Sequence, residues 1–136
     1  MTRQTAEKSS LAGLGFLFFT GILGWWIPGA GHWIIGRHKH AAIIFISLMF
    51  AFGMGIYIGS IAAIDARTPW YWAQLLFSPA TAYIAHLSGS VYHLDSYGRP
   101  REIGEIYTGV AGMLNLLCVV NAVYLAHCLN VKEQNQ

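Results

Sequence analysis

Hydrophobic residues fall into three long runs that contain no Lys, Arg, Asp or Glu. The runs cover residues 11–27, 41–64 and 106–129. A helix needs ~20 mostly apolar residues to cross ~30 Å of hydrocarbon at 1.5 Å per residue. The second and third runs meet that length, and the first ends at Trp25 and Trp26, whose indole rings favour a membrane interface. The pattern therefore predicts an all-α integral membrane protein.

A further stretch, residues 70–92, is long enough to span a membrane but is more polar than the others and contains Pro79. Backbone groups that a proline frees inside a membrane must be satisfied by protein or water, because lipid cannot hydrogen-bond them. A kinked transmembrane helix inside the bundle is the first interpretation of this stretch, and a re-entrant or interfacial segment is the second. The sequence thus predicts four transmembrane helices joined by short loops, with the third one weak.

The chain has no room for a separate soluble domain. Residues 1–10 form a polar N-terminal tail, residues 11–129 form a single helical membrane domain, and residues 130–136 form a polar C-terminal tail. A basic start before an apolar run is also typical of a signal peptide. The apolar run exceeds the usual ~7–15 residues and no A-x-A site follows it, so we expect the first helix to be retained.

Charge is scarce, which favours a lipid bilayer as the surroundings. Charged residues make up 10% of the chain, against ~25% in an ordinary soluble domain. A net charge of +2 that is spread along the chain does not indicate nucleic-acid binding. With four spans, Arg37 and Lys39 would share one side with Arg99 and Arg101, and we expect that side to be cytoplasmic.

Small residues recur at four-residue spacing on two of the predicted helices, together with one polar residue on the last. These helix-packing positions are Ala51, Gly55, Gly59, Ala63, Thr108, Gly112 and Asn115. Membrane helices associate through close contact of small residues and occasional hydrogen bonds. Such faces serve either a homodimer or packing within one chain, and packing within the chain is the favoured interpretation.

Polar side chains inside a membrane are costly and often indicate function. The candidates for a polar site are His86, Ser90, His93 and Asn115. No carboxylate, Lys or Arg lies well inside a predicted span, which argues against an ion-coupled transporter.

Metal binding and catalysis have little support in the sequence. Zinc sites need three or four converging ligands, and the available groups, His38, His40, His93 and Asp95, are spread over two loops. No nucleophile elbow, phosphate loop, HExxH or CxxC is present. We therefore expect no metal, no other cofactor and no enzymatic activity.

Two strings resemble the motifs of an uncharacterised family of small bacterial multi-span membrane proteins, of planctomycete and acidobacterial type. Residues 28–37 read PGAGHWIIGR, similar to PGxGHxxxGR, and residues 106–117 read IYTGVAGMLNLL, similar to YTxVAGLLNLL. The first motif is distantly similar to the TM-two domain. The resemblance implies a multi-pass protein of the bacterial cytoplasmic (inner) membrane. The pattern continues to an acidic residue where this chain has Asn121, so no carboxylate role is carried over.

The first motif makes physical sense as a rigid turn. Its positions are Pro28, Gly29, Gly31, His32, Gly36 and Arg37. Proline ends a helix, glycine permits a sharp turn, and Arg37 can reach phosphate headgroups. The leading functional hypothesis is a non-enzymatic accessory or scaffold subunit of a membrane assembly, which contacts other membrane subunits or itself. The alternative is a small transporter or a lipid- or quinone-handling protein that uses the polar intramembrane face.

Overall fold

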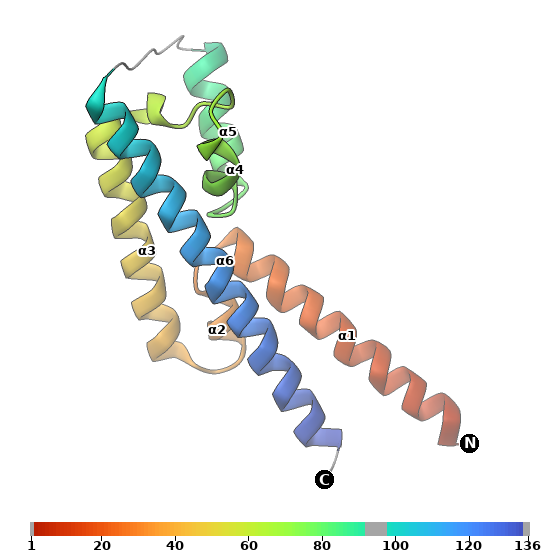
Figure 1. Cartoon of the computed structure of the whole chain (residues 1–136). Coiled ribbons are helices and arrows are strands. Elements are labelled where there is room, and N and C mark those ends of the chain that lie inside the picture. The colour runs from red at the N-terminus through yellow and green to blue at the C-terminus, as the bar shows by residue number, and fades with distance from the viewer. Residues whose placement is uncertain (1, 92–97, 135–136) are drawn as a thin grey trace.

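The computed structural model describes residues 2–91 and 98–134, with side chains described over residues 13–89 and 98–132. Every regular element in this part of the chain is helical (Figure 1). In chain order the elements are α1 (Thr2–Trp26), α2 (Ala30–Ile34), α3 (His38–Gly59), the 3₁₀ turn η1 (Ile61–Ala63), α4 (Trp70–Leu75), α5 (Ala80–His86), the π-helical turn η2 (Leu87–Val91) and α6 (Arg99–Gln134). The backbones of α1 and α6 continue into both polar tails.

Two helices of the described chain, α3 and α6, are long and apolar enough to cross a membrane. They measure about 33 Å and about 54 Å at 1.5 Å per residue. Burial covers 22% and 33% of their most apolar windows, whereas a core helix of a soluble protein is mostly buried. The apolar part of α1, Gly13–Trp26, is shorter, at about 21 Å. Of the four spans expected, these two have the length and hydropathy of a full crossing.

The two long helices cross in close contact because glycine lines both sides of the crossing. A Cβ atom built on Gly59 would lie 2.8 Å from the Cα atom of Gly104, and one on Gly55 would lie 2.6 Å from the side chain of Thr108. The small-residue face of α3 is therefore occupied by α6 of the same chain.

The second predicted helix ends earlier than its apolar run. It stops at Gly59, and Ser60 follows with a left-handed φ of 64°. Ala63 consequently lies in η1 and not on α3, although it remains buried, and Ala51 is half-buried on α3.

The third predicted span is a helical hairpin. The segment 76–79 separates α4 from α5, and α5 and η2 return to η1, at the end of the bundle where α3 stops (Figure 1). Along the outward arm, Trp70 lies beside Gly109, and Ala73 and Phe77 lie beside Gly112. The single kinked helix of the first interpretation is therefore not formed, and the segment has the folded-back shape of the second.

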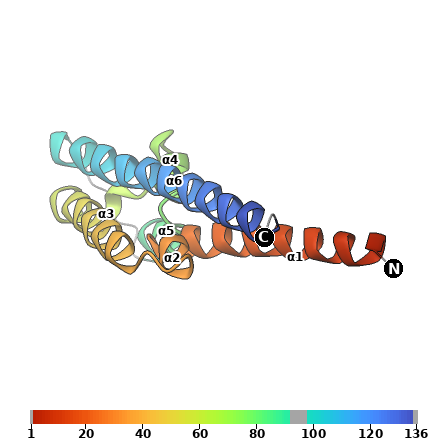
Figure 2. The same ribbon diagram turned by 90° about the horizontal axis from the view of Figure 1, so that it is seen from below.

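A second hairpin forms at the opposite end of the bundle. The chain leaves α1 at Trp26 and turns through Gly29, which has a left-handed φ of 84°. It then runs back as α2, where Gly31 contacts Thr20 and Ala122. Figure 2 shows α1 alongside the C-terminal half of α6, and Figure 1 shows both chain ends on this side of the molecule.

The two basic loops that were expected to share a side lie at opposite ends of α3. Arg37 and Lys39 stand at its start, whereas Arg101 lies near its end, where the backbone of Pro100 lies close to Gly59. The expectation was wrong because residues 60–91 fold back and do not cross the bundle.

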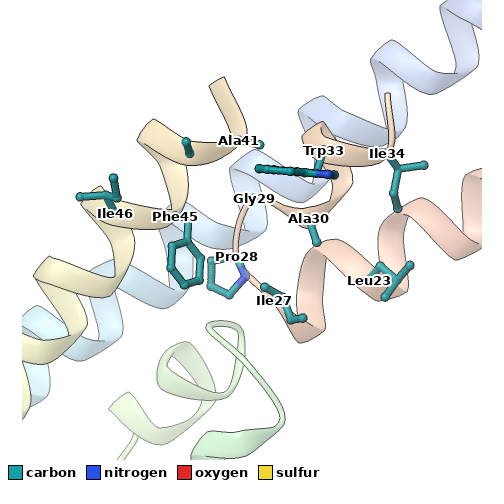
Figure 3. A pocket seen from close by; sticks show the side chains of 11 residues that line it. Leu23, Ile27, Pro28, Gly29, Ala30, Trp33, Ile34, Ala41, Phe45 and Ile46 are labelled. Atoms are coloured by element: carbon teal, nitrogen blue, oxygen red, sulfur yellow. The ribbon is translucent and has the colours of Figure 1, made fainter. Parts of the chain in front are cut away.

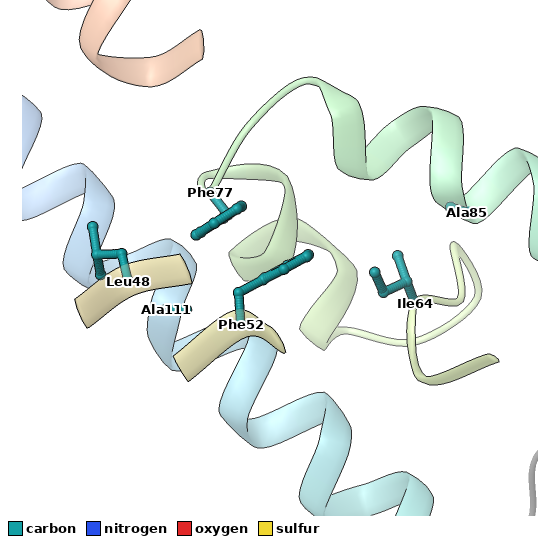
Figure 4. Close-up of a cluster of buried hydrophobic side chains, with 6 residues drawn as sticks. All are labelled: Leu48, Phe52, Ile64, Phe77, Ala85 and Ala111. Carbon is teal, nitrogen blue, oxygen red and sulfur yellow. The ribbon is translucent and has the colours of Figure 1, made fainter. Parts of the chain in front are cut away.

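The buried apolar core is small and lies between α3, α6 and the α4–α5 hairpin (Figure 4). Its members are Leu48, Phe52, Ile64, Phe77, Ala85 and Ala111. The rings of Phe52 and Phe77 stack with centroids 4.0 Å apart and planes 5° apart. Many large hydrophobic side chains point outward instead, among them Phe18, Phe50 and Leu117, which are 64–69% exposed. The outer surface is thus extensively apolar.

Candidate functional site

Both hairpin turns are made by a proline that leaves one helical carbonyl without its donor. Proline lacks an N–H group, so the carbonyl four residues earlier loses its helical hydrogen bond. Pro28 frees the carbonyl of Gly24 in this way, and Pro79 frees that of Leu75. The indole Nε1 of Trp25 donates to the Leu75 carbonyl at 3.1 Å. One turn therefore supplies the donor that the other lacks.

The carboxamide of Asn115 joins the two turns to α6. Asn115 is fully buried, and its Nδ2 donates to the carbonyls of Phe77 at 2.8 Å, Leu76 at 3.2 Å and Gly24 at 3.4 Å. An amide carries two N–H donors, so three carbonyls exceed its capacity. Its own Oδ1 is also buried without a hydrogen-bond partner. The junction is therefore rich in acceptors and poor in donors.

The junction lies midway along the bundle. Gly59 and Gly55 of α3 face Gly104 and Thr108 of α6 in antiparallel register. Continuing that register along both helices places Asn115 level with Leu48, at the middle of α3. The two hairpins run inward from opposite ends of the bundle, and their turns thus meet about halfway along α3.

Further polar contacts hold the hairpin arms in place. Gln74, fully buried on α4, donates from Nε2 to the Ala63 carbonyl at 3.0 Å and to Thr108 Oγ1 at 2.9 Å. Its Oε1 is buried without a hydrogen-bond partner. Ser78 Oγ donates to the carbonyl of Trp26 at 2.9 Å, which adds a direct bond between the two turns.

Gly112 on α6 allows α4 to lie close against α6. A Cβ atom on Gly112 would collide with the carbonyl oxygen of Ala73 and would lie 3.1 Å from the amide nitrogen of Phe77. Thr108 and Gly112 of the predicted packing face therefore both contact α4, and Thr108 also contacts α3.

A cavity of about 430 Å³ adjoins the α1–α2 turn on the side facing α3 (Figure 3). Hydrophobic side chains and glycine line it, from α1, the turn, α2 and the first half of α3. The lining residues are Leu23, Ile27, Pro28, Gly29, Ala30, Trp33, Ile34, Ala41, Ala42, Phe45 and Ile46. The turn at the start of the first motif, residues 28–32, thus borders both the Asn115 junction and the cavity.

Basic residues stand beside this cavity. The segment 37–40, Arg-His-Lys-His, is exposed and connects the cavity-lining part of α2 to that of α3. The ring of Trp33, which lines the cavity, meets the ring of His38 edge-on with centroids 4.8 Å apart.

The first motif contacts α6 just beyond the second motif. His32 of the first motif is buried, and its Nε2 lies 3.3 Å from Nδ2 of Asn121, which follows the second motif on α6. The Asn121 amide can donate to Nε2 when this ring nitrogen carries no proton.

The predicted polar site is not assembled among the described residues. His86 is exposed on α5, whereas Asn115 is buried against the two turns. The side chain of Ser90 and the whole of His93 lie outside the described residues. Of the metal candidates, His38 and His40 are exposed, Asp95 is outside the described residues, and no group of three or more His, Cys, Asp or Glu converges in the described part.

An ion cluster at the other end of α3 was missed by the sequence reasoning. Arg101 bonds Glu105 at 2.8 Å and Asp65 at 3.1 Å. The four-residue spacing of the first pair is a helical signal that could have been found. Asp65 is 36 residues away, and only folding brings it near. The cluster ties the loop after α3 to the start of α6.

Comparison with known proteins gives a family but no activity. No match to this chain was found among curated proteins or among solved structures. A model of one protein family matches residues 19–135, which include both hairpins, the junction and the cavity. The chain therefore belongs to DUF6677, a family of unknown function.

Proposed function

We propose that this chain is a multi-pass membrane protein that binds a membrane amphiphile in the cavity between α3 and the α1–α2 turn. In this proposal α3 and α6 cross the bilayer, and the two hairpins enter it from opposite faces and meet near its middle. Irregular backbone is tolerated at that depth only where protein or water satisfies it. The bonds from Asn115, Trp25 and Ser78 to the turn carbonyls supply this satisfaction.

The distribution of basic residues gives the proposed orientation. The end of the bundle that holds both termini carries Arg3, Lys8, Arg37, Lys39 and Lys132, and the other end carries Arg67, Arg99 and Arg101. Lys and Arg are enriched in cytoplasmic segments. We therefore place both termini and the start of α3 in the cytoplasm of a bacterial cell, across its inner membrane.

The cavity is the single observation that carries the binding function. Its volume of about 430 Å³ falls within the ~300–1,000 Å³ of small-molecule sites. Its lining offers no charged group, so the part of a ligand that enters it must be apolar. A lipid acyl chain or the isoprenoid tail of a quinone has this chemistry, and both are present in the surrounding bilayer.

The accessory-subunit hypothesis has less support than lipid binding. It was based on small-residue faces on several helices, together with little soluble mass and no charge inside the predicted spans. In the structure Gly55 and Gly59 face α6, and Gly112 faces α4, so these faces are already used within the chain.

The test is lipid retention by a variant that fills the cavity. Ala42 lines the cavity, and Ile43 is its neighbour on the outer face of α3, 65% exposed. Protein purified in mild detergent is analysed for bound lipid by native mass spectrometry. We expect Ala42→Trp to retain lipid roughly tenfold less well, a change of ~1.4 kcal/mol, and Ile43→Trp to behave as the wild type.

Equal retention in Ala42→Trp and the wild type would reject the cavity as the binding site. Co-purification of larger membrane subunits in fixed ratio, with no retained lipid, would instead favour the accessory role.

A further inference from the structure

We infer that the amphiphile is an anionic phospholipid, with its phosphate at Arg37 and Lys39 and one acyl chain in the cavity. This inference rests on the proposed function and adds the class of headgroup. It begins from the order of residues along the chain. Trp33 and Ile34 line the cavity just before the basic segment, and Ala41 resumes the lining just after it.

The segment 37–40 therefore lies at the rim of the cavity. The ring contact between Trp33, in the lining, and His38, in the segment, places the two directly against each other.

The charges at this rim are available to a ligand. Arg37 and Lys39 are exposed, and neither forms an ion pair with an acidic side chain of the described residues. Asp65 and Glu105, by contrast, are bound to Arg101 at the other end of α3. A phosphate at the rim would meet two cations with no competing carboxylate among the described neighbours.

Polarity changes from charged to apolar along α3 in the order found in a phospholipid. Arg37 precedes the helix, and the cavity lining continues inward to Ile46, about 14 Å further at 1.5 Å per residue. A headgroup at the membrane surface with a chain running inward matches this order. The neutral head of a quinone would leave both cations without a partner, so the charges favour the anionic lipid.

The proposed orientation agrees with this choice, because the rim lies on the cytoplasmic side. Anionic lipids give that leaflet its negative surface potential, and basic residues near the surface are attracted to it. The expected attraction amounts to roughly a fivefold preference per basic side chain. Two side chains should therefore give at least a tenfold preference for an anionic headgroup.

The experiment titrates purified protein with phosphatidylglycerol and with phosphatidylcholine of identical acyl chains, and native mass spectrometry counts the bound lipids. We expect the wild type to bind phosphatidylglycerol at least roughly tenfold more tightly. The double variant Arg37→Gln, Lys39→Gln should bind both lipids about equally, because phosphatidylglycerol, with its net negative charge, loses more affinity than zwitterionic phosphatidylcholine.

The matched control removes the same charge at the other end of the bundle. Arg67 and Arg99 are both exposed, and we expect Arg67→Gln, Arg99→Gln to keep the full preference. If the double variant at the rim keeps the preference, or the control loses it equally, the headgroup site is wrong. In either case the comparison of lipid retention between Ala42→Trp and the wild type still tests the cavity separately. If the wild type binds neither lipid, the proposed function fails as well.

Discussion

The Asn115 junction gives the sharpest test of the fold, through the variant Asn115→Leu. Leucine has the same branched skeleton of four side-chain heavy atoms as asparagine but offers no donor, so the carbonyls of Phe77, Leu76 and Gly24 lose their shared amide. Each buried carbonyl left without a partner costs about 1–3 kcal/mol. With two N–H groups lost, the gross cost is about 2–6 kcal/mol.

One term acts in the opposite direction. In the wild type Oδ1 of Asn115 is itself buried without a partner, and leucine removes that unsatisfied acceptor. Removing it offsets about 1–3 kcal/mol. We therefore expect a net loss of about 2 kcal/mol, which lowers Tm by roughly 5–10 °C in a chain of this size.

The assay is thermal unfolding in detergent, followed by the loss of the monodisperse peak in size-exclusion chromatography. The control is Asn121→Leu, because Asn121 is exposed and makes its contact with the single side chain of His32. Hydrogen exchange supplies the local measurement, and the amides of residues 76–81 should exchange faster in Asn115→Leu. An unchanged Tm together with unchanged exchange in this segment would refute the proposed role of Asn115.

A further prediction concerns packing. Gly112→Ala places a methyl group against the Ala73 carbonyl, so we expect the free energy of unfolding in detergent to fall by about 1–3 kcal/mol. The control is Gly53→Ala, on an exposed face of α3 where a Cβ atom would have nothing within 4 Å. This variant should be neutral or slightly stabilising. Equal Tm values for these two variants would contradict the close approach of α4 to α6.

The sequence predicted which residues allow close contact but could not predict where each contact is made. Spacing alone placed Gly55, Gly59 and Gly112 on small-residue faces, because a repeat of four puts residues on one side of a helix. The same spacing fits a second copy of the chain equally well. In the structure α6 packs on Gly55 and Gly59 and α4 packs on Gly112, a choice of neighbour that the spacing does not specify.

The candidate site was predicted only in part, for the same reason. Asn115 was identified as a buried polar residue, but its partners are backbone carbonyls from segments 38 and 91 residues away. Backbone acceptors carry no sequence signature. His86 was grouped with Asn115 by chemistry, and the fold separates them because the α4–α5 hairpin turns at Asn115 and α5 then runs back towards η1.

What the sequence determined by itself was the set of apolar helices, the turn at Pro28 and the break at Pro79. These follow from local chemistry, since lipid requires helices and proline removes a donor wherever it stands. Only the tertiary structure decided that both breaks meet at Asn115 and that residues 60–91 return to the end of the bundle where α3 stops. A proline frees a carbonyl but does not specify its new donor, and that choice depends on side chains which only packing brings within hydrogen-bond distance.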